Sequence, residues 1–158
     1  MMYNQTLNLP FRKIYAIDFE YYGDAGEVPK IVCMVVQNVH TGEISRVWRD
    51  ELRDMKTPPF ETEEDIVILT YFAPAEIQSM LTLDWSTNVS VIDLFAEFRC
   101  ETNGNPNIIR KRLVDALSHY HLEYFIPEEK DAMRSLILSG GPWTKDQQED
   151  ILHYCEQD

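Results

Sequence analysis

Residues 12–22 of this chain, RKIYAIDFEYY, decide the fold. Bulky apolar side chains alternate along them, which predicts a buried β-strand with a side-chain period of two. KIVCMVVQNV at residues 30–39 predicts a second strand, and HTGE at residues 40–43 predicts a turn in which Gly42 supplies the positive φ. ISRVWRDEL at residues 44–52 predicts a third strand. The segment 12–52 is therefore expected to form a three-stranded antiparallel meander.

After the meander, strands are expected to alternate with helices. The sequence predicts a linker (56–65), a short buried parallel strand (66–72, IVILTYF), a helix with Pro74 in its first turn (74–85) and a further strand (89–94, VSVIDL). Helices are expected within residues 107–121, within residues 127–141 and after Trp143, where Thr144 and Gln147 form a capping-box pattern. This order predicts an α/β fold in which helices flank a mixed sheet.

Size and composition predict one domain spanning residues 1–158, with 44% apolar residues to form its core. Its three cysteines, Cys33, Cys100 and Cys155, have no CxxC spacing, which predicts reduced thiols, a cytoplasmic location and no structural zinc. The N-terminal MMYNQTLNLPFRK lacks the apolar stretch of a secretory signal. No apolar run approaches the ~20 residues of a membrane span, so no membrane contact is expected.

The formal net charge of −13 disfavours a protein that binds nucleic acid through a broad basic face. It does not disfavour a site built from carboxylates, because such a site is acidic until divalent cations fill it. The positions of the acidic residues are therefore more informative about function than the net charge.

Carboxylates stand near both ends of the chain and in its middle. Asp18 and Glu20 are two residues apart on the first predicted strand, so both side chains point to the same face. Glu76 lies early in a predicted helix, and Asp158 follows Tyr154 by four residues, which places both on one face of the last helix. Residues from three distant segments could thus meet in one acidic site.

Hard oxygen ligands of this kind suit Mg²⁺ or Mn²⁺. Two such ions about 4 Å apart can activate a water molecule, stabilise a leaving 3′ oxygen and align a phosphodiester for hydrolysis. We expect two ions to bind Asp18, Glu20, Glu76 and Asp158, and the Tyr154 hydroxyl to orient the attacking water. These five residues are the predicted catalytic set.

The motifs resemble those of the DEDDy branch of the DnaQ-like 3′→5′ exonucleases, and most closely the proofreading domain of family A (polymerase I-type) DNA polymerases. AIDFE at residues 16–20 resembles the D-x-E of motif I, and YCEQD at residues 154–158 resembles the Y-x-x-x-D of motif III. TYFAPAEIQSML at residues 70–81 resembles motif II, although Glu76 replaces the usual Asp. VIDLFAEF at residues 91–98 resembles the segment that follows motif II. The resemblance covers residues 12–158.

This resemblance implies a ribonuclease H-like fold that releases 5′-mononucleotides from single-stranded or frayed DNA 3′ ends. It implies a monomer that forms the N-terminal part of a longer DNA polymerase, with the polymerase domain following. Ala73 and Ala75 replace the Asn and the aromatic residue that usually accompany motif II. In the family the motif II acid often reaches its metal through water, and the longer Glu76 side chain could replace that water.

Several alternatives remain open at this level. Asp93 could be the motif II ligand, or it could cap a helix beginning near Leu94. Four aromatic residues are expected to bind substrate, by stacking on a terminal base or by lining the groove: Phe19, Tyr21, Tyr22 and Trp143. Core packing is the alternative for the tyrosines, and anchoring of the last helix is the alternative for the tryptophan. A ribonuclease D-type RNA exonuclease and an inactive exonuclease-fold scaffold are the alternative functions.

Overall fold

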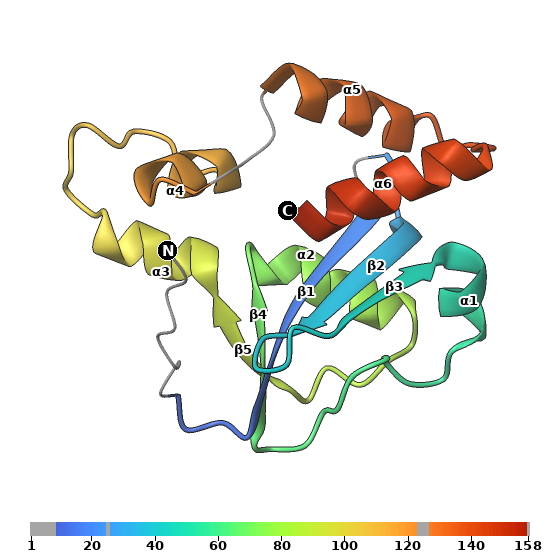
Figure 1. The fold of residues 1–158 in the computed structure, drawn as a ribbon, viewed down its shortest axis with the longest axis horizontal. Helices are drawn as coiled ribbons and strands as arrows, with labels where there is room; N and C mark the ends of the chain where they lie inside the picture. The colour runs from blue at the N-terminus through green and yellow to red at the C-terminus, as the bar shows by residue number, and fades with distance from the viewer. Residues whose placement is uncertain (1–8, 25, 123–126, 158) are drawn as a thin grey trace.

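A single five-stranded sheet forms the centre of the molecule in the computed structural model, which describes residues 9–24, 26–122 and 127–157 (Figure 1). The strands are β1 (Lys13–Tyr22), β2 (Lys30–Asn38), β3 (Ile44–Trp48), β4 (Ile66–Thr70) and β5 (Ser90–Asp93), and they lie in the order β3-β2-β1-β4-β5. β2 runs antiparallel to β1 and β3, whereas β4 runs parallel to both β1 and β5. The predicted meander and the predicted parallel strand are confirmed.

Six helices are described: α1 (Arg49–Asp54), α2 (Ala73–Thr82), α3 (Leu94–Glu101), α4 (Leu113–His119), α5 (Pro127–Leu138) and α6 (Lys145–Gln157). α5 and α6 lie side by side across the upper ends of β1 and β2, while α3 and α4 lie on the opposite side of the molecule from α1 (Figure 1). α2 packs against β1 and β5. The predicted α/β fold, a mixed sheet flanked by helices, is confirmed.

The period of two along β1 divides the core into two clusters. Ile17 and Phe19 join the cluster that packs under α2 through Met80. Cys33 and Ile151 belong to the second cluster, which lies under α5 and α6. Asp18 and Glu20 fall between the residues of the first cluster in sequence, so their side chains point away from it. The strand thus supplies core packing on one face and charged groups on the other.

Two local expectations need correction. Residues 49–52 were expected to extend the third strand, but they form α1, whose first turn carries Asp50 and Glu51, favourable charges at a helix N-terminus. The helix expected within residues 107–121 begins only at Leu113, where Arg112 and Asp115 form reciprocal capping bonds. Capping bonds set the start of α4, whereas in α1, which has no side-chain cap, the acidic first turn favours the helix.

Among the described residues, no helix has both the length and the apolar character needed to cross a bilayer.

Candidate active site

The candidate site opens where β1 and β4 part. β1 pairs with β4 only over the register from Lys13↔Ile66 to Ala16↔Leu69, so the second half of β1 continues without this neighbour. β4 ends at Thr70, and the chain then enters α2, which contacts β1. The first turn of α2 therefore approaches the part of β1 that carries the D-x-E pair. Ligand sites in open α/β sheets commonly lie at such carboxyl ends of strands.

A cavity of about 410 Å³ occupies this position. Asp18 and Glu20 line it from β1, Glu76 lines it from α2, and Tyr154 lines it from α6. Four of the five predicted catalytic residues are therefore brought together from three separate elements. Asp158, the fifth, lies outside the described residues.

Glu76 is the least solvated carboxyl group of the site. Its side chain is only 3% exposed, and its Oε2 atom has no hydrogen-bond partner among the described residues. Burial, followed by the negative charges of Asp18 and Glu20, raises the pKa of Glu76 to about 10, against a smaller opposing effect of a hydrogen bond from the Phe19 backbone. Without a cation in the site, Glu76 is therefore protonated at neutral pH.

An unpartnered carboxyl oxygen in a buried acidic site fits the binding of a divalent cation. A cation would give Glu76 Oε2 a partner and would neutralise the repulsion among the three carboxylates. The donor set also fits, because carboxylate oxygens are the ligands that Mg²⁺ and Mn²⁺ prefer. The described residues of the site therefore suit the predicted metals.

Cys155, which follows Tyr154 in the third motif but had no predicted role, contacts the same cluster. The ligand atoms of Asp18, Glu20 and Cys155 all lie within 4.8 Å of one another. The Cys155 thiol lies 3.3 Å from Asp18 Oδ2 and 3.4 Å from the Asp18 carbonyl oxygen, to either of which it donates. Burial is the main cause that raises the pKa of this thiol, so it stays protonated and donates to Asp18. We infer that Cys155 holds the Asp18 side chain in position.

The position of Tyr154 depends on how α6 begins. The Thr144 backbone N–H donates to Gln147 Oε1 over 2.9 Å, and the Gln147 backbone N–H donates to Thr144 Oγ1 over 3.2 Å. This is the predicted capping box, and it is confirmed. Tyr154 is largely buried further along the helix, with the Lys130 ammonium 5.6 Å from its ring centroid. The capping box fixes the first turn of α6, and the helix then places Tyr154 at the cavity.

Two of the predicted substrate-binding aromatics need correction. The Phe19 ring is 4% exposed and packs 6.3 Å from Trp85, because alternation along β1 turns it into the core under α2. Trp143 is 7% exposed, packs edge-on against Trp48 and donates its indole N–H to the Leu136 carbonyl over 3.0 Å. Neither ring is free to stack on a base, and Trp143 instead anchors the start of α6.

The two tyrosines after the D-x-E pair do line the cavity. Tyr21 is 39% exposed, and burial together with the nearby carboxylates raises the pKa of its phenol. Tyr22 is half-buried and packs edge-on against Trp143. Tyr21 is therefore the better placed of the two to meet a substrate.

Asp93 is a helix cap in this structure. Its Oδ1 accepts hydrogen bonds from the backbone N–H groups of Phe95 (3.0 Å) and Ala96 (3.4 Å), the first residues of α3. The same oxygen accepts the Phe72 N–H over 3.1 Å. Asp93 does not line the cavity, so the capping alternative is confirmed and Glu76 remains the candidate ligand from this region.

Sequence reasoning missed several residues of the cavity, among them one arginine and two aromatic residues. Arg134 of α5 is exposed and lines the cavity, across from the carboxylates. Tyr71 and Phe72 line it from the turn before α2. The arginine carries no motif around it, and only the return of α5 onto β1 brings it to the site.

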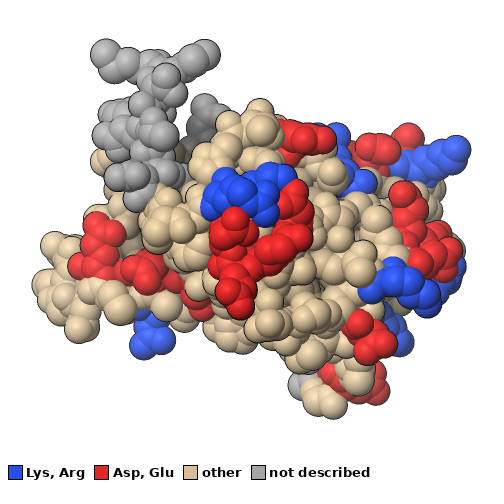
Figure 2. Space-filling model, turned by 90° about the horizontal axis from the view of Figure 1, so that it is seen from below, with Lys and Arg blue, Asp and Glu red and all other residues tan. Residues whose placement is uncertain are grey.

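Several charged side chains elsewhere on the surface form ion pairs. Figure 2 shows one face of the molecule, on which most Lys and Arg side chains border Asp and Glu side chains. Arg12 forms ion pairs with Glu61, Glu63 and Asp65, and Lys13 pairs with Glu61. On this face no broad basic surface opposes the net charge of −13.

No protein-family model matches this chain, and no curated protein matches it either. Among solved structures, the chain is similar to the EXO domain of Nibbler from Aedes aegypti. The TM-score is 0.44 and the sequence identity is 9%, over 90% of this chain and 72% of that one. A likeness at this level supports neither an activity nor a substrate.

Proposed function

We propose that this protein is a metal-dependent 3′→5′ exonuclease that acts on single-stranded or frayed DNA 3′ ends. The observation that carries the proposal is the meeting of Asp18, Glu20, Glu76 and Tyr154 in one cavity, although they come from β1, α2 and α6. Side chains so distant in sequence converge in the order and geometry that the motifs predict. The sequence resemblance supplies the reaction class and the DNA substrate.

In the proposed reaction, Asp18, Glu20 and Glu76 hold two Mg²⁺ or Mn²⁺ ions, with Asp158 as the fourth ligand. The ions, when bound, lower the pKa of a water molecule and stabilise charge on the phosphate and on the leaving oxygen. The Tyr154 hydroxyl forms a hydrogen bond with the attacking water and thereby orients it. Cys155 keeps the Asp18 carboxylate turned toward the cavity. Arg134 is placed to attract the phosphate of the terminal nucleotide.

Metal loading and the state of Glu76 are coupled in this proposal. Glu76 must lose its proton before it can bind a cation, and its raised pKa makes that loss unfavourable at neutral pH. Metal affinity is therefore expected to rise with pH. We further propose a cytoplasmic location, from the cysteine pattern, and, from the resemblance, a monomer whose polymerase domain follows this domain in a longer protein.

The test is digestion of a 5′-labelled single-stranded DNA oligonucleotide in the presence of Mn²⁺, with Asp18→Ala as the control and a matched RNA oligonucleotide in parallel. A ladder that shortens from the 3′ end and disappears in the Asp18→Ala variant supports the proposal. Faster digestion of the RNA would replace the DNA substrate by RNA. If neither strand is shortened and Mn²⁺ does not raise the melting temperature, the inactive scaffold becomes the better description.

A further inference from the structure

The cavity continues onto a second surface, which we call the aromatic–basic strip. Six residues line this shallow depression: Tyr71, Phe72, Phe95, Arg110, Lys111 and Arg112. Tyr71 and Phe72 line the candidate active site as well, so the two hollows adjoin along these rings. A chain leaving the cavity past Phe72 would therefore meet the strip directly.

Phe72 has an unusual backbone. Its φ of 85° and ψ of 67° place it in the left-handed region, which bulky side chains rarely adopt. The Asp93 carboxylate holds this conformation by accepting the Phe72 N–H. The ring is 47% exposed and lies edge-on to Phe95, with ring centroids 5.5 Å apart. Strained residues of this kind concentrate at binding sites, where the surrounding structure stabilises them.

The basic side chains of the strip differ in what they already bind. Lys111 donates to the Thr102 hydroxyl and to the carbonyl oxygens of Thr102 and Ile108, so its ammonium serves the fold. Arg112 pairs with Asp115 over 2.9 Å. Arg110 is exposed and forms none of the described ion pairs or side-chain hydrogen bonds.

Arg99 extends the positive charge along α3. Its guanidinium lies 5.5 Å from the Phe95 ring centroid. Four of the fourteen Lys and Arg residues of the chain thus fall within residues 99–112. Exposed aromatic rings beside arginines suit single-stranded nucleic acid, because rings stack on bases and guanidinium groups bind phosphates.

We propose that the aromatic–basic strip binds the nucleotides that precede the 3′ terminal one, with Phe72 stacking on a base and Arg110 contacting a phosphate. This inference rests on the proposed function, because it requires the 3′ end to lie in the cavity. None of the six residues that line the strip is a carboxylate, so none is a predicted metal ligand. Binding to the strip should therefore persist in EDTA, when the catalytic site is empty of cations.

The experiment measures the anisotropy of fluorescein-labelled oligo(dT) and oligo(rU) of about ten nucleotides, in EDTA, against the full chain over a range of salt concentrations. Phe72→Gly is expected to weaken binding about 5-fold or more, the loss of one stacking contact, without changing the salt dependence. Arg110→Ala is expected to reduce the slope of log K against log salt by about 0.7, the loss of one phosphate contact. The DNA and RNA arms show which backbone the strip favours.

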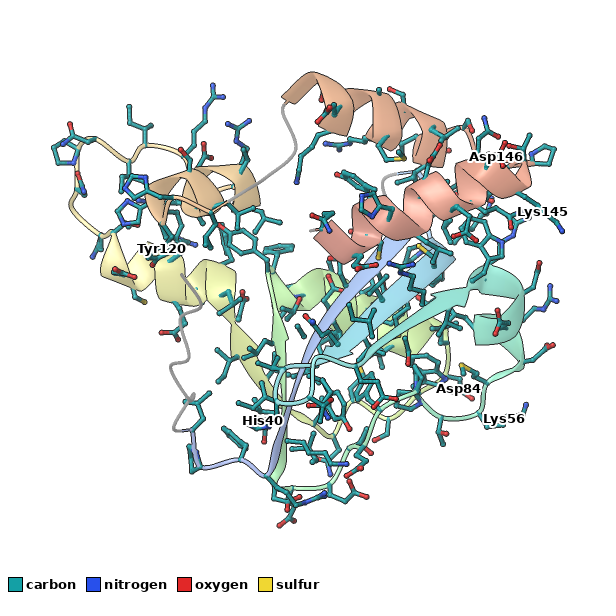
Figure 3. The ribbon with its side chains drawn as sticks, in the orientation of Figure 1. His40, Lys56, Asp84, Tyr120, Lys145 and Asp146 are labelled. Carbon is teal, nitrogen blue, oxygen red and sulfur yellow. The ribbon has the colours of Figure 1, made fainter. Side chains whose placement is uncertain are left out.

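Lys56→Ala is the matched control, because Lys56 is an exposed basic residue on the far side of the molecule from α3 and α4 (Figure 3). Tyr120, at the end of α4, marks the side of the strip in the same view. Glycine accepts a φ of 85° without strain, so Phe72→Gly is expected to fold. Arg110→Ala replaces an exposed residue and keeps the test decisive if Phe72→Gly does not fold.

Wild-type affinity in Phe72→Gly and in Arg110→Ala would overturn the strip while leaving the exonuclease proposal intact. Failure of the wild-type protein to bind either oligonucleotide would also overturn it, and would indicate a protein contact for the exposed rings. Conversely, undiminished cleavage by Asp18→Ala would overturn the proposed function without affecting the strip. The two failures are therefore distinguishable.

Discussion

Glu76→Gln should stabilise the metal-free protein and, in the same variant, abolish its stabilisation by metal. In the unfolded chain a glutamate ionises near pH 4.5, whereas in the folded protein the pKa of Glu76 is about 10. Between these two values the folded state holds a proton that the unfolded state releases. The stability contributed by the neutral carboxyl is thus fully present below pH 4.5, and it declines as pH rises toward 10.

The magnitude follows from the two pKa values. At pH 7.5 the unfolded group is three units above its pKa, and each unit corresponds to about 1.36 kcal/mol, so the loss is at most about 4 kcal/mol. Repulsion by the charges of Asp18 and Glu20 supplies only part of the raised pKa, and we expect a loss of about 2–4 kcal/mol. Glutamine has nearly the same shape and no charge, so the variant should escape this loss.

The assay is urea denaturation in EDTA at several pH values between about 5 and 8.5. The wild-type free energy of unfolding should fall relative to that of Glu76→Gln as pH rises. Glu43→Gln removes an exposed carboxylate in the β2–β3 turn and serves as the control, with the same pH dependence as wild type. Parallel curves for wild type and Glu76→Gln would refute the argument, because they would show that Glu76 ionises in the folded protein as it does in the unfolded chain.

Three further changes test the assignments of single residues. Tyr154→Phe should lower the cleavage rate by about ten- to a hundredfold while leaving the Mn²⁺-induced rise in melting temperature unchanged, and loss of metal stabilisation would show that the phenol holds the metal site instead. Asp93→Ala should cost about 1–2 kcal/mol of stability, because α3 loses its cap, and the metal affinity of the folded variant should be unchanged. Loss of metal binding in a stably folded variant would make Asp93 a ligand. Thr144→Ala should cost about 1 kcal/mol in chemical denaturation, and Lys145→Ala, next to it and outside the capping box, should cost less than half of that.

The arrangement of the sheet was predictable because its strands carry strong apolar signals, alternating in β1 and nearly continuous in β2 and β4. Alternation in β1 and the turn at Gly42 were sufficient to predict the meander. The same alternation predicted that Asp18 and Glu20 share a face, and spacing predicted that Tyr154 belongs to a helix. The limits of short helices escaped prediction because they depend on local interactions of the first turn rather than on apolar spacing. The acidic first turn of α1 and the capping bonds at the start of α4 illustrate this.

The contacts between elements could not be predicted in the same way. Trp143 and Phe19 looked available for a ligand in the sequence, yet tertiary packing buries both rings. Arg134 had no motif around it, and Cys155 lay within the third motif at a position to which the pattern gives no role; both reach the site because α5 and α6 fold back on β1. The raised pKa of Glu76 likewise arises from its burial and from the charges of two residues that are more than fifty positions away in the chain.

The start of α6 determines the position of a chemical group well removed from it. Tyr154 follows Thr144 by ten residues, a distance of about 15 Å along the axis at 1.5 Å per residue. Because a helix of this length is stiff, a rotation or a shift of the first turn of α6 also moves the Tyr154 phenol. The indole of Trp143 and the Thr144–Gln147 hydrogen bonds therefore help to set the position of the Tyr154 side chain in the cavity. Substitutions at this remote end are therefore expected to displace the Tyr154 phenol without changing any residue that lines the cavity.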